Sequence, residues 1–121
     1  MGKIIHVVED DDDIRFIIEY ILMDSGYQVF SSATATAFYE TMNNPKPDLV
    51  LLDVMLPDGN GIDICRDIRL SKDADQIKVI VMSAHAAEKA VLEQACADSF
   101  ISKPFDLDKL ITQVKKLLPN D

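Results

Sequence analysis

The sequence predicts an α/β fold, a five-stranded parallel sheet with helices on both faces. Short apolar runs alternate along the 121 residues with segments whose apolar residues recur at helical spacing. Such alternation implies parallel strands, because each crossover must be right-handed and must lay its helix on a face of the sheet. The apolar run at 49–53 is continuous, as in a strand that is buried on both faces.

The first half of the chain predicts three strands and two helices. The strands are expected at 4–8, 29–30 and 49–53, and the second helix at 35–43. The first helix shows a single apolar stripe and is expected to stop at Gly26. The residues of that stripe are Ile14, Ile17, Ile18, Ile21 and Leu22.

The second half predicts two more strands, at 79–82 and 100–102, and three more helices. Helices are expected at 62–70 and 86–97, and Asp106 is the expected N-cap of the last one. The helix at 86–97 offers mainly alanine to the sheet, so it should be the least firmly held. The apolar stripe of the last helix consists of Leu107, Leu110, Ile111, Val114, Leu117 and Leu118.

Bulk properties limit the classes of function. The length suits one domain over residues 1–121, with no output domain in the chain. Twelve basic and 21 acidic residues give a net charge of −9, which argues against direct binding to nucleic acid or to an anionic membrane. No apolar stretch is long enough to span a bilayer, and the two cysteines form no CxxC pair. We therefore expect buried free thiols and a cytoplasmic protein.

Polar side chains end four of the predicted strands. The carboxyl ends of parallel strands meet at one edge of a sheet, so these side chains can converge although they lie far apart in the sequence. They are Glu9, Asp10, Asp53, Ser83 and Lys103.

The acidic members of this set suit a magnesium ion. Mg²⁺ prefers oxygen ligands and keeps several waters. Asp10 and Asp53 are expected to bind the metal directly and Glu9 through a water, and the backbone carbonyl of Met55 could add another ligand. Without a cation, three crowded carboxylates would drive at least one pKa upwards.

The same set suits phosphoryl transfer to an aspartate. A carboxylate is a competent nucleophile towards phosphorus, so Asp53 is the predicted phosphoacceptor. The transfer depends on neutralising charge on the phosphoryl oxygens, a task that the metal, the Lys103 ammonium and the Ser83 hydroxyl could share.

Other polar residues have simpler interpretations. Asp11, Asp12 and Asp13 are better explained as acids at a helix N-terminus, where they favour the dipole. His6 lies within an apolar strand and is interpreted as a core residue.

Four segments resemble those of bacterial response-regulator receiver domains, and the resemblance spans essentially the whole chain. The segments are KIIHVVEDD, LVLLDVMLPDGNGID, VIVMSA and FISKPF. The resemblance implies a doubly wound, flavodoxin-like sheet of order 2-1-3-4-5. It also implies Mg²⁺-dependent phosphotransfer to Asp53 from a histidine kinase or a histidine phosphotransfer protein, with Mn²⁺ as a substitute metal. The bond between Lys103 and Pro104 is expected to be cis.

The resemblance also implies a conformational switch. Ser83 and Phe100 match the switch positions, and Phe100 is expected to rotate inward when Ser83 moves to the phosphoryl group. Their movement would alter the face formed by the helix at 86–97, the strand at 100–102 and the last helix. A downstream target or output domain would respond to this face, and two copies could dimerise through it after phosphorylation.

Two alternatives remain beside the receiver switch. A phosphatase that uses an aspartyl phosphate would need an acid two residues after Asp53, where this chain has Met55. The phosphoryl group should therefore persist, and Met55 and His85 are predicted to tune its lifetime. The other alternative is an interaction domain that keeps the fold but acts without phosphorylation.

Overall fold

The computed structural model describes residues 2–42, 45–71, 76–83, 97–104 and 106–119. His85, Cys96 and almost all of the helix predicted at 86–97 lie outside these ranges. The predictions made for them therefore stay predictions.

The sheet has five strands, all parallel, and it confirms the predicted order. The strands run side by side as β2 (Gln28–Ser32), β1 (Ile4–Val8), β3 (Leu49–Asp53), β6 (Lys78–Ser83) and β7 (Ser99–Ser102). β6 and β7 are the fourth and fifth predicted strands. All five residues of β3 are buried, as the continuous apolar run predicted.

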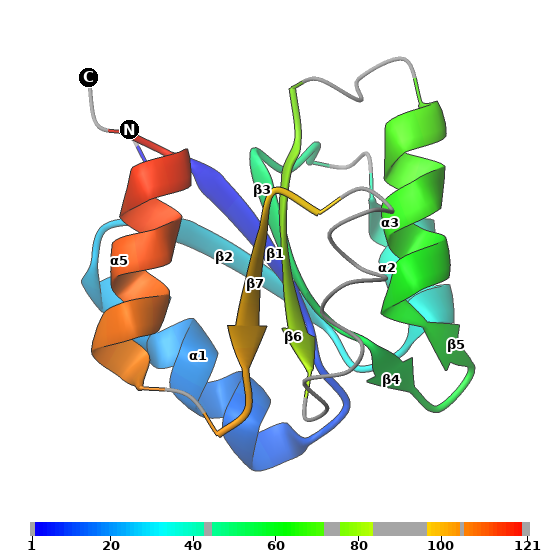
Figure 1. The fold of residues 1–121 in the computed structure, drawn as a ribbon, viewed down its shortest axis with the longest axis horizontal. Helices are drawn as coiled ribbons and strands as arrows, with labels where there is room; N and C mark the ends of the chain where they lie inside the picture. The colour runs from blue at the N-terminus through cyan, green and yellow to red at the C-terminus, as the bar shows by residue number, and fades with distance from the viewer. Residues whose placement is uncertain (1, 43–44, 72–75, 84–96, 105, 120–121) are drawn as a thin grey trace.

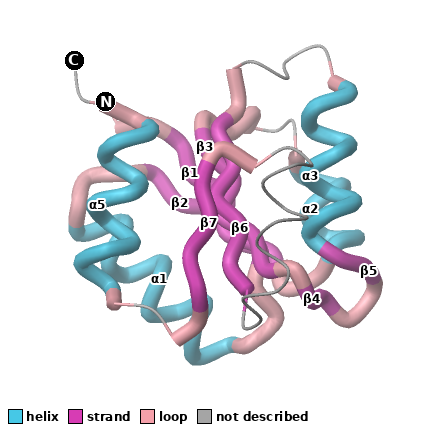
Figure 2. Tube along the Cα trace, viewed as in Figure 1, coloured by secondary structure: helices cyan, strands magenta, loops and turns pink. Residues whose placement is uncertain are grey.

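Helices cover both faces of this sheet, as Figures 1 and 2 show. The helices α1 (Asp12–Asp24) and α5 (Leu107–Leu117) lie on one face, and α2 (Ala35–Thr41) and α3 (Gly61–Leu70) lie on the other. The apolar core accordingly forms two clusters, one under each pair of helices. Of the helices that the structure describes, none is long and apolar enough to cross a membrane.

The predicted helix boundaries follow from capping. The Asp11 side chain accepts a hydrogen bond from the Ile14 N–H at 3.0 Å, so it is an N-cap, as its simpler interpretation required. Asp106 caps α5 in the same way through the Asp108 N–H, at 2.7 Å. Gly26 follows α1 with a positive φ of 98°, a conformation that only glycine adopts easily.

A short hairpin between β3 and α3 was not predicted. It consists of β4 (Met55–Leu56) and β5 (Gly59–Asn60), which pair in antiparallel fashion. Strands of two residues are too short to show any periodicity, and Pro57-Asp58-Gly59 indicates only a turn.

The outer side of α1 is more apolar than the predicted stripe allowed. Ile18 and Leu22 are fully buried, as expected, but the Ile17 side chain is 48% exposed. Ile17 belongs to the predicted apolar stripe, but it is not part of the buried core. Three further exposed apolar residues of α1 are Phe16, Tyr20 and Met23.

Cys65 corrects another expectation. It is fully buried in α3, but it is disulfide-bonded rather than a free thiol. The residues that the structure describes include no free cysteine.

His6 is a buried core residue, as predicted, and its environment makes stability depend on pH. Its Nε2 lies 2.7 Å from Ser32 Oγ and its ring packs edge-on against Phe38. Burial lowers the pKa of His6 from 6.5 to about 4. His6 therefore binds a proton below about pH 6.5 in the unfolded chain, but only below about pH 4 in the folded chain.

The contribution of His6 to the free energy of unfolding should consequently fall by about 3 kcal/mol as the pH drops from 7 to 4. Urea unfolding of the natural chain and of a His6→Leu variant, each at pH 7 and pH 4.5, measures this contribution. The natural chain should lose more stability than the variant over that interval. An equal loss in both proteins would contradict the assignment to His6.

Candidate functional site

The five polar residues predicted to converge do lie together at the carboxyl edge of the sheet. Their elements explain this, because β1, β3, β6 and β7 run parallel and end at the same edge, seen at the bottom of Figure 1. Asp53 and Ser83 are the last residues of β3 and β6. Glu9 and Asp10 follow β1, and Lys103 follows β7.

Three carboxylates form an acidic cluster at this edge. Glu9, Asp10 and Asp53 each offer an oxygen, and these oxygens lie within 4.8 Å of one another. Glu9 is fully buried and Asp53 nearly so, whereas Asp10 is exposed to solvent. An all-oxygen donor set that is open on one side fits Mg²⁺, which binds a few carboxylates and keeps its remaining waters.

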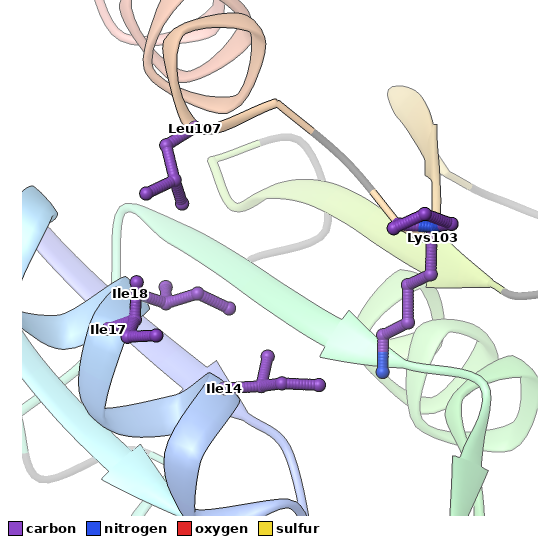
Figure 3. A pocket seen from close by; sticks show the side chains of 6 residues that line it. Ile14, Ile17, Ile18, Lys103 and Leu107 are labelled. Carbon is purple, nitrogen blue, oxygen red and sulfur yellow. The ribbon is translucent and has the colours of Figure 1, made fainter.

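Lys103 binds two of the three carboxylates. Its Nζ lies 2.6 Å from Glu9 Oε1 and 2.9 Å from Asp53 Oδ2. Figure 3 shows its side chain reaching towards the end of β3. Burial by itself would lower the pKa of Lys103, but the hydrogen bonds to Glu9 and Asp53 outweigh it and the pKa is raised. The ammonium group therefore stays charged beside Asp53.

The buried position of Glu9 raises its pKa to about 7. Desolvation is the largest cause, and the nearby Asp53 adds to it. Hydrogen bonds from Lys103 and from the Asp11 N–H oppose the rise, the latter at 3.2 Å. The crowding of carboxylates predicted from the sequence thus acts on Glu9.

The Asp53 carboxylate is held by its own loop as well as by Lys103. The Met55 N–H donates to Asp53 Oδ1 at 3.3 Å, so each carboxylate oxygen of Asp53 has a donor. Just beyond, the Val54 N–H donates to the Met82 carbonyl at 3.1 Å. The main chain of β3 therefore stays beside β6 one residue past the end of the strand.

Gly61 closes the same loop by a close approach to β3. Its N–H donates to the Val54 carbonyl at 2.8 Å. A Cβ at this position would collide with the Asp53 carbonyl oxygen and with the Leu52 side chain. Only glycine leaves the end of β3 in place here.

The other predicted site residues differ in how deeply they are buried. Ser83 is buried, and its carbonyl accepts a hydrogen bond from the Lys103 N–H at 2.8 Å. Phe100 is partly buried against the core cluster under α2 and α3. The Met55 side chain is 66% exposed, and the bond before Pro104 is cis, as expected.

The response regulator receiver domain family matches residues 5–115. The chain belongs to this family. As a receiver domain it takes part in two-component signalling, in which a histidine kinase phosphorylates an aspartate of the receiver. The resemblance read from the four sequence segments is confirmed.

Two curated relatives show how the receiver domain compares in length. It is 33% identical over 121 residues to sporulation initiation phosphotransferase F of Bacillus subtilis, covering 98% of this chain and 96% of that protein. It is 32% identical over 118 residues to the alkaline phosphatase synthesis transcriptional regulatory protein PhoP of the same organism, covering 98% of this chain and 49% of that protein. The chain spans about half the length of the transcriptional regulators that it matches.

Solved structures agree with the fold. The response regulator TrrA of Thermotoga maritima, in complex with Mg²⁺-BeF, has a TM-score of 0.85 at 30% identity, covering 95% of this chain and 98% of that one. A response regulator of Chloroflexus aurantiacus reaches a TM-score of 0.92 at 24% identity, covering 99% and 100%. These neighbours confirm the doubly wound, flavodoxin-like fold.

Arg15 supports the receiver site and was missed in the sequence. Its Nη1 donates to the Glu9 carbonyl at 2.9 Å, and its Nη2 pairs with Asp12 at 2.6 Å. It therefore fastens the turn that carries Glu9 and Asp10. Its partner at the site is a backbone carbonyl, which leaves no signal in the sequence.

Proposed function

We propose that Asp53 is the residue of this receiver domain that accepts the phosphoryl group. The observation that carries the proposal is the position of Lys103, whose ammonium binds Asp53 Oδ2 at 2.9 Å beside the acidic cluster. A cation next to the acceptor oxygen can neutralise charge that builds up on an incoming phosphoryl group.

The transfer would proceed in line. An Asp53 carboxylate oxygen attacks phosphorus while the bond between phosphorus and the donor histidine nitrogen breaks. The imidazole keeps the bonding electron pair and takes a proton from solvent. The Lys103 ammonium and the Ser83 hydroxyl would bind phosphoryl oxygens as the transfer proceeds.

Glu9, Asp10 and Asp53 are the residues that would hold Mg²⁺, with the Met55 carbonyl as a further ligand. Bound Mg²⁺ supplies positive charge that offsets the charge of the carboxylates and of the phosphoryl group. Support comes from the closeness of the three carboxylates and from the Mg²⁺-BeF complex of TrrA. Mn²⁺, which also prefers carboxylate and water ligands, would substitute.

The phosphodonor would dock beside Lys103. An open apolar groove of about 390 Å³ lies there, between the start of α1 and the segment that joins β7 to α5 (Figure 3). A helical histidine kinase or histidine phosphotransfer protein could lay an apolar face in this groove, which would bring its histidine to Asp53. The residues that line the groove are Ile14, Ile17, Ile18, Lys103, Pro104 and Leu107.

Phosphorylation would then shift a conformational equilibrium. Ser83 would move to the phosphoryl group and Phe100 would turn inward, which changes the face that includes β7 and α5. A downstream target or an output domain would bind this face, and the phosphorylated chains could pair through it. The chain would act as a switch with slow autodephosphorylation rather than as a turnover enzyme.

Intact-mass spectrometry after incubation with acetyl phosphate tests the proposed function. With Mg²⁺ the chain should gain the mass of one phosphoryl group, and it should gain nothing when EDTA replaces the metal. If no gain occurs with Mg²⁺ and calorimetry detects no Mg²⁺ binding, the domain acts without phosphorylation.

The residue two positions after Asp53 should set the lifetime of the phosphoryl group. Met55 is exposed beside Asp53 and cannot transfer a proton. A Met55→Asp variant should lose its phosphoryl group at least about tenfold faster, because a carboxylate can activate the attacking water. The decay of the phosphorylated mass over time measures the lifetime. Met55→Asn, which is similar in shape but is not a base, is the matched control, and equal rates in both variants would contradict the role of the carboxylate.

A further inference from the structure

The β4–β5 hairpin carries a proposed metal ligand, but its own strands are too short and too exposed to fix its position. Three of its four strand residues are exposed, and only Leu56 is partly buried. A two-stranded hairpin is marginally stable by itself. Its position must therefore depend on contacts with its neighbours.

The strongest of these contacts is made by Asp58, in the turn of the hairpin. Asp58 Oδ1 accepts a hydrogen bond from the Ala35 N–H at 2.8 Å. Asp58 Oδ2 accepts from the Thr36 N–H at 2.9 Å and from Thr36 Oγ1 at 2.5 Å. The carboxylate thus binds the first N–H groups of α2, which no helical carbonyl can satisfy.

Two observations support a tight attachment. The hydrogen bond from the Thr36 hydroxyl is the largest cause that lowers the pKa of Asp58, and the bond from the Thr36 N–H lowers it further. Asp58 is therefore a carboxylate at neutral pH. The hairpin also lies close to α2, since a Cβ on Gly59 would lie 3.4 Å from the Ala35 Cβ. Ala35 itself is buried in the core cluster under α2 and α3.

The other end of the hairpin leads back to the phosphoacceptor. Met55 pairs with Asn60 across the hairpin, and the Met55 N–H donates to Asp53 Oδ1. Asn60 in turn caps α3 through the Asp63 N–H at 2.9 Å. The hairpin is therefore held by Asp58, which binds α2, and by Asn60, which caps α3. Met55 pairs with Asn60 and donates to Asp53, so it links the hairpin to the phosphoacceptor.

We propose that Asp58 is a positioning residue of the phosphoacceptor site: by binding the first turn of α2 it holds the hairpin, and with it the Met55 carbonyl, where that carbonyl completes the Mg²⁺ site. The inference rests on the proposed function and adds a residue that touches neither metal nor phosphoryl group. Releasing Asp58 would let the Met55 carbonyl move.

The affinity of the full chain for Mg²⁺, measured by calorimetric titration, tests the inference. An Asp58→Ala variant should bind Mg²⁺ about tenfold more weakly, at the lower end of the effects seen for residues that orient metal ligands. Asp58→Asn keeps one oxygen acceptor and should recover part of the affinity. At saturating Mg²⁺, the rate of phosphorylation by acetyl phosphate should return to within about threefold of that of the natural chain, because Asp53 and Lys103 are unchanged.

Thr34→Ala is the matched control. Thr34 caps the same helix through the Ala37 N–H, at 3.0 Å, but among the residues that the structure describes its side chain makes no hydrogen bond to the hairpin. This variant weakens the start of α2 and should keep the Mg²⁺ affinity of the natural chain. Unchanged affinity in Asp58→Ala, or an equal loss in Thr34→Ala, would overturn the inference and leave the proposed function intact. Failure of the natural chain to bind Mg²⁺ would overturn both.

Discussion

An Asp53→Ala variant should take up no phosphoryl group from acetyl phosphate and Mg²⁺, whereas the natural chain takes up one. The other acids of the cluster cannot replace Asp53. Glu9 is fully buried, so phosphorus cannot reach its carboxylate. Asp10 is exposed, but the Lys103 ammonium pairs with Glu9 and Asp53 in the described part of the chain. A phosphoryl group that approached Asp10 would therefore not meet this cation beside the attacking oxygen. Intact mass measured over the same time course compares the two proteins.

Asp13→Ala is the control for this loss. Asp13 is an exposed acid in the first turn of α1, so the variant removes one negative charge close to the site without touching it. It should be phosphorylated at the rate of the natural chain. Phosphorylation of Asp53→Ala at a similar rate would mean that another residue accepts the phosphoryl group.

A Lys103→Met variant should be phosphorylated about 100-fold more slowly, because it loses the fixed cation beside the acceptor oxygen. Its Mg²⁺ binding should persist, since Glu9, Asp10 and Asp53 all remain. This separates Lys103 from the metal ligands: the variant loses rate, whereas Asp53→Ala loses the acceptor itself. Single-turnover kinetics with acetyl phosphate at saturating Mg²⁺ measure the rate.

Lys109→Met is the matched control for Lys103→Met. Lys109 is exposed on α5, so its loss changes the net charge equally and leaves the site untouched. A rate for Lys103→Met within about threefold of the control would contradict the role of Lys103 in stabilising charge during the transfer. The comparison also separates the local role of Lys103 from the effect of making an acidic chain more negative.

Most of the fold could be predicted because its determinants are local. Each strand of the five-stranded sheet contains an apolar run, and each described helix has apolar residues at helical spacing and a capping residue, such as Asp106 at the start of α5. The β4–β5 hairpin is too short for periodicity, and Ile17 fits the helical spacing of a core residue although nothing in the structure described covers it fully.

The candidate site could be predicted as a set of residues but not as an arrangement. Parallel strands bring their ends together, so the convergence of the Glu9–Asp10 pair, Asp53, Ser83 and Lys103 follows from the fold class. Their bonding does not follow. That Lys103 divides its ammonium between Glu9 and Asp53, and that Asp58 binds α2, depends on side chains far apart in the sequence.

The order of apolar runs and helical stripes, read with the polar residues that follow the strands, determined the fold class and the chemical character of the site. Tertiary structure decided how deeply each carboxylate is buried and which partner it meets. The physical reason is that periodicity reports the face on which a residue lies, whereas burial and distance depend on how separate elements pack. Glu9 illustrates the difference: its position after a strand was evident, but its full burial and its raised pKa arise only where β1, β3 and the segment after β7 meet.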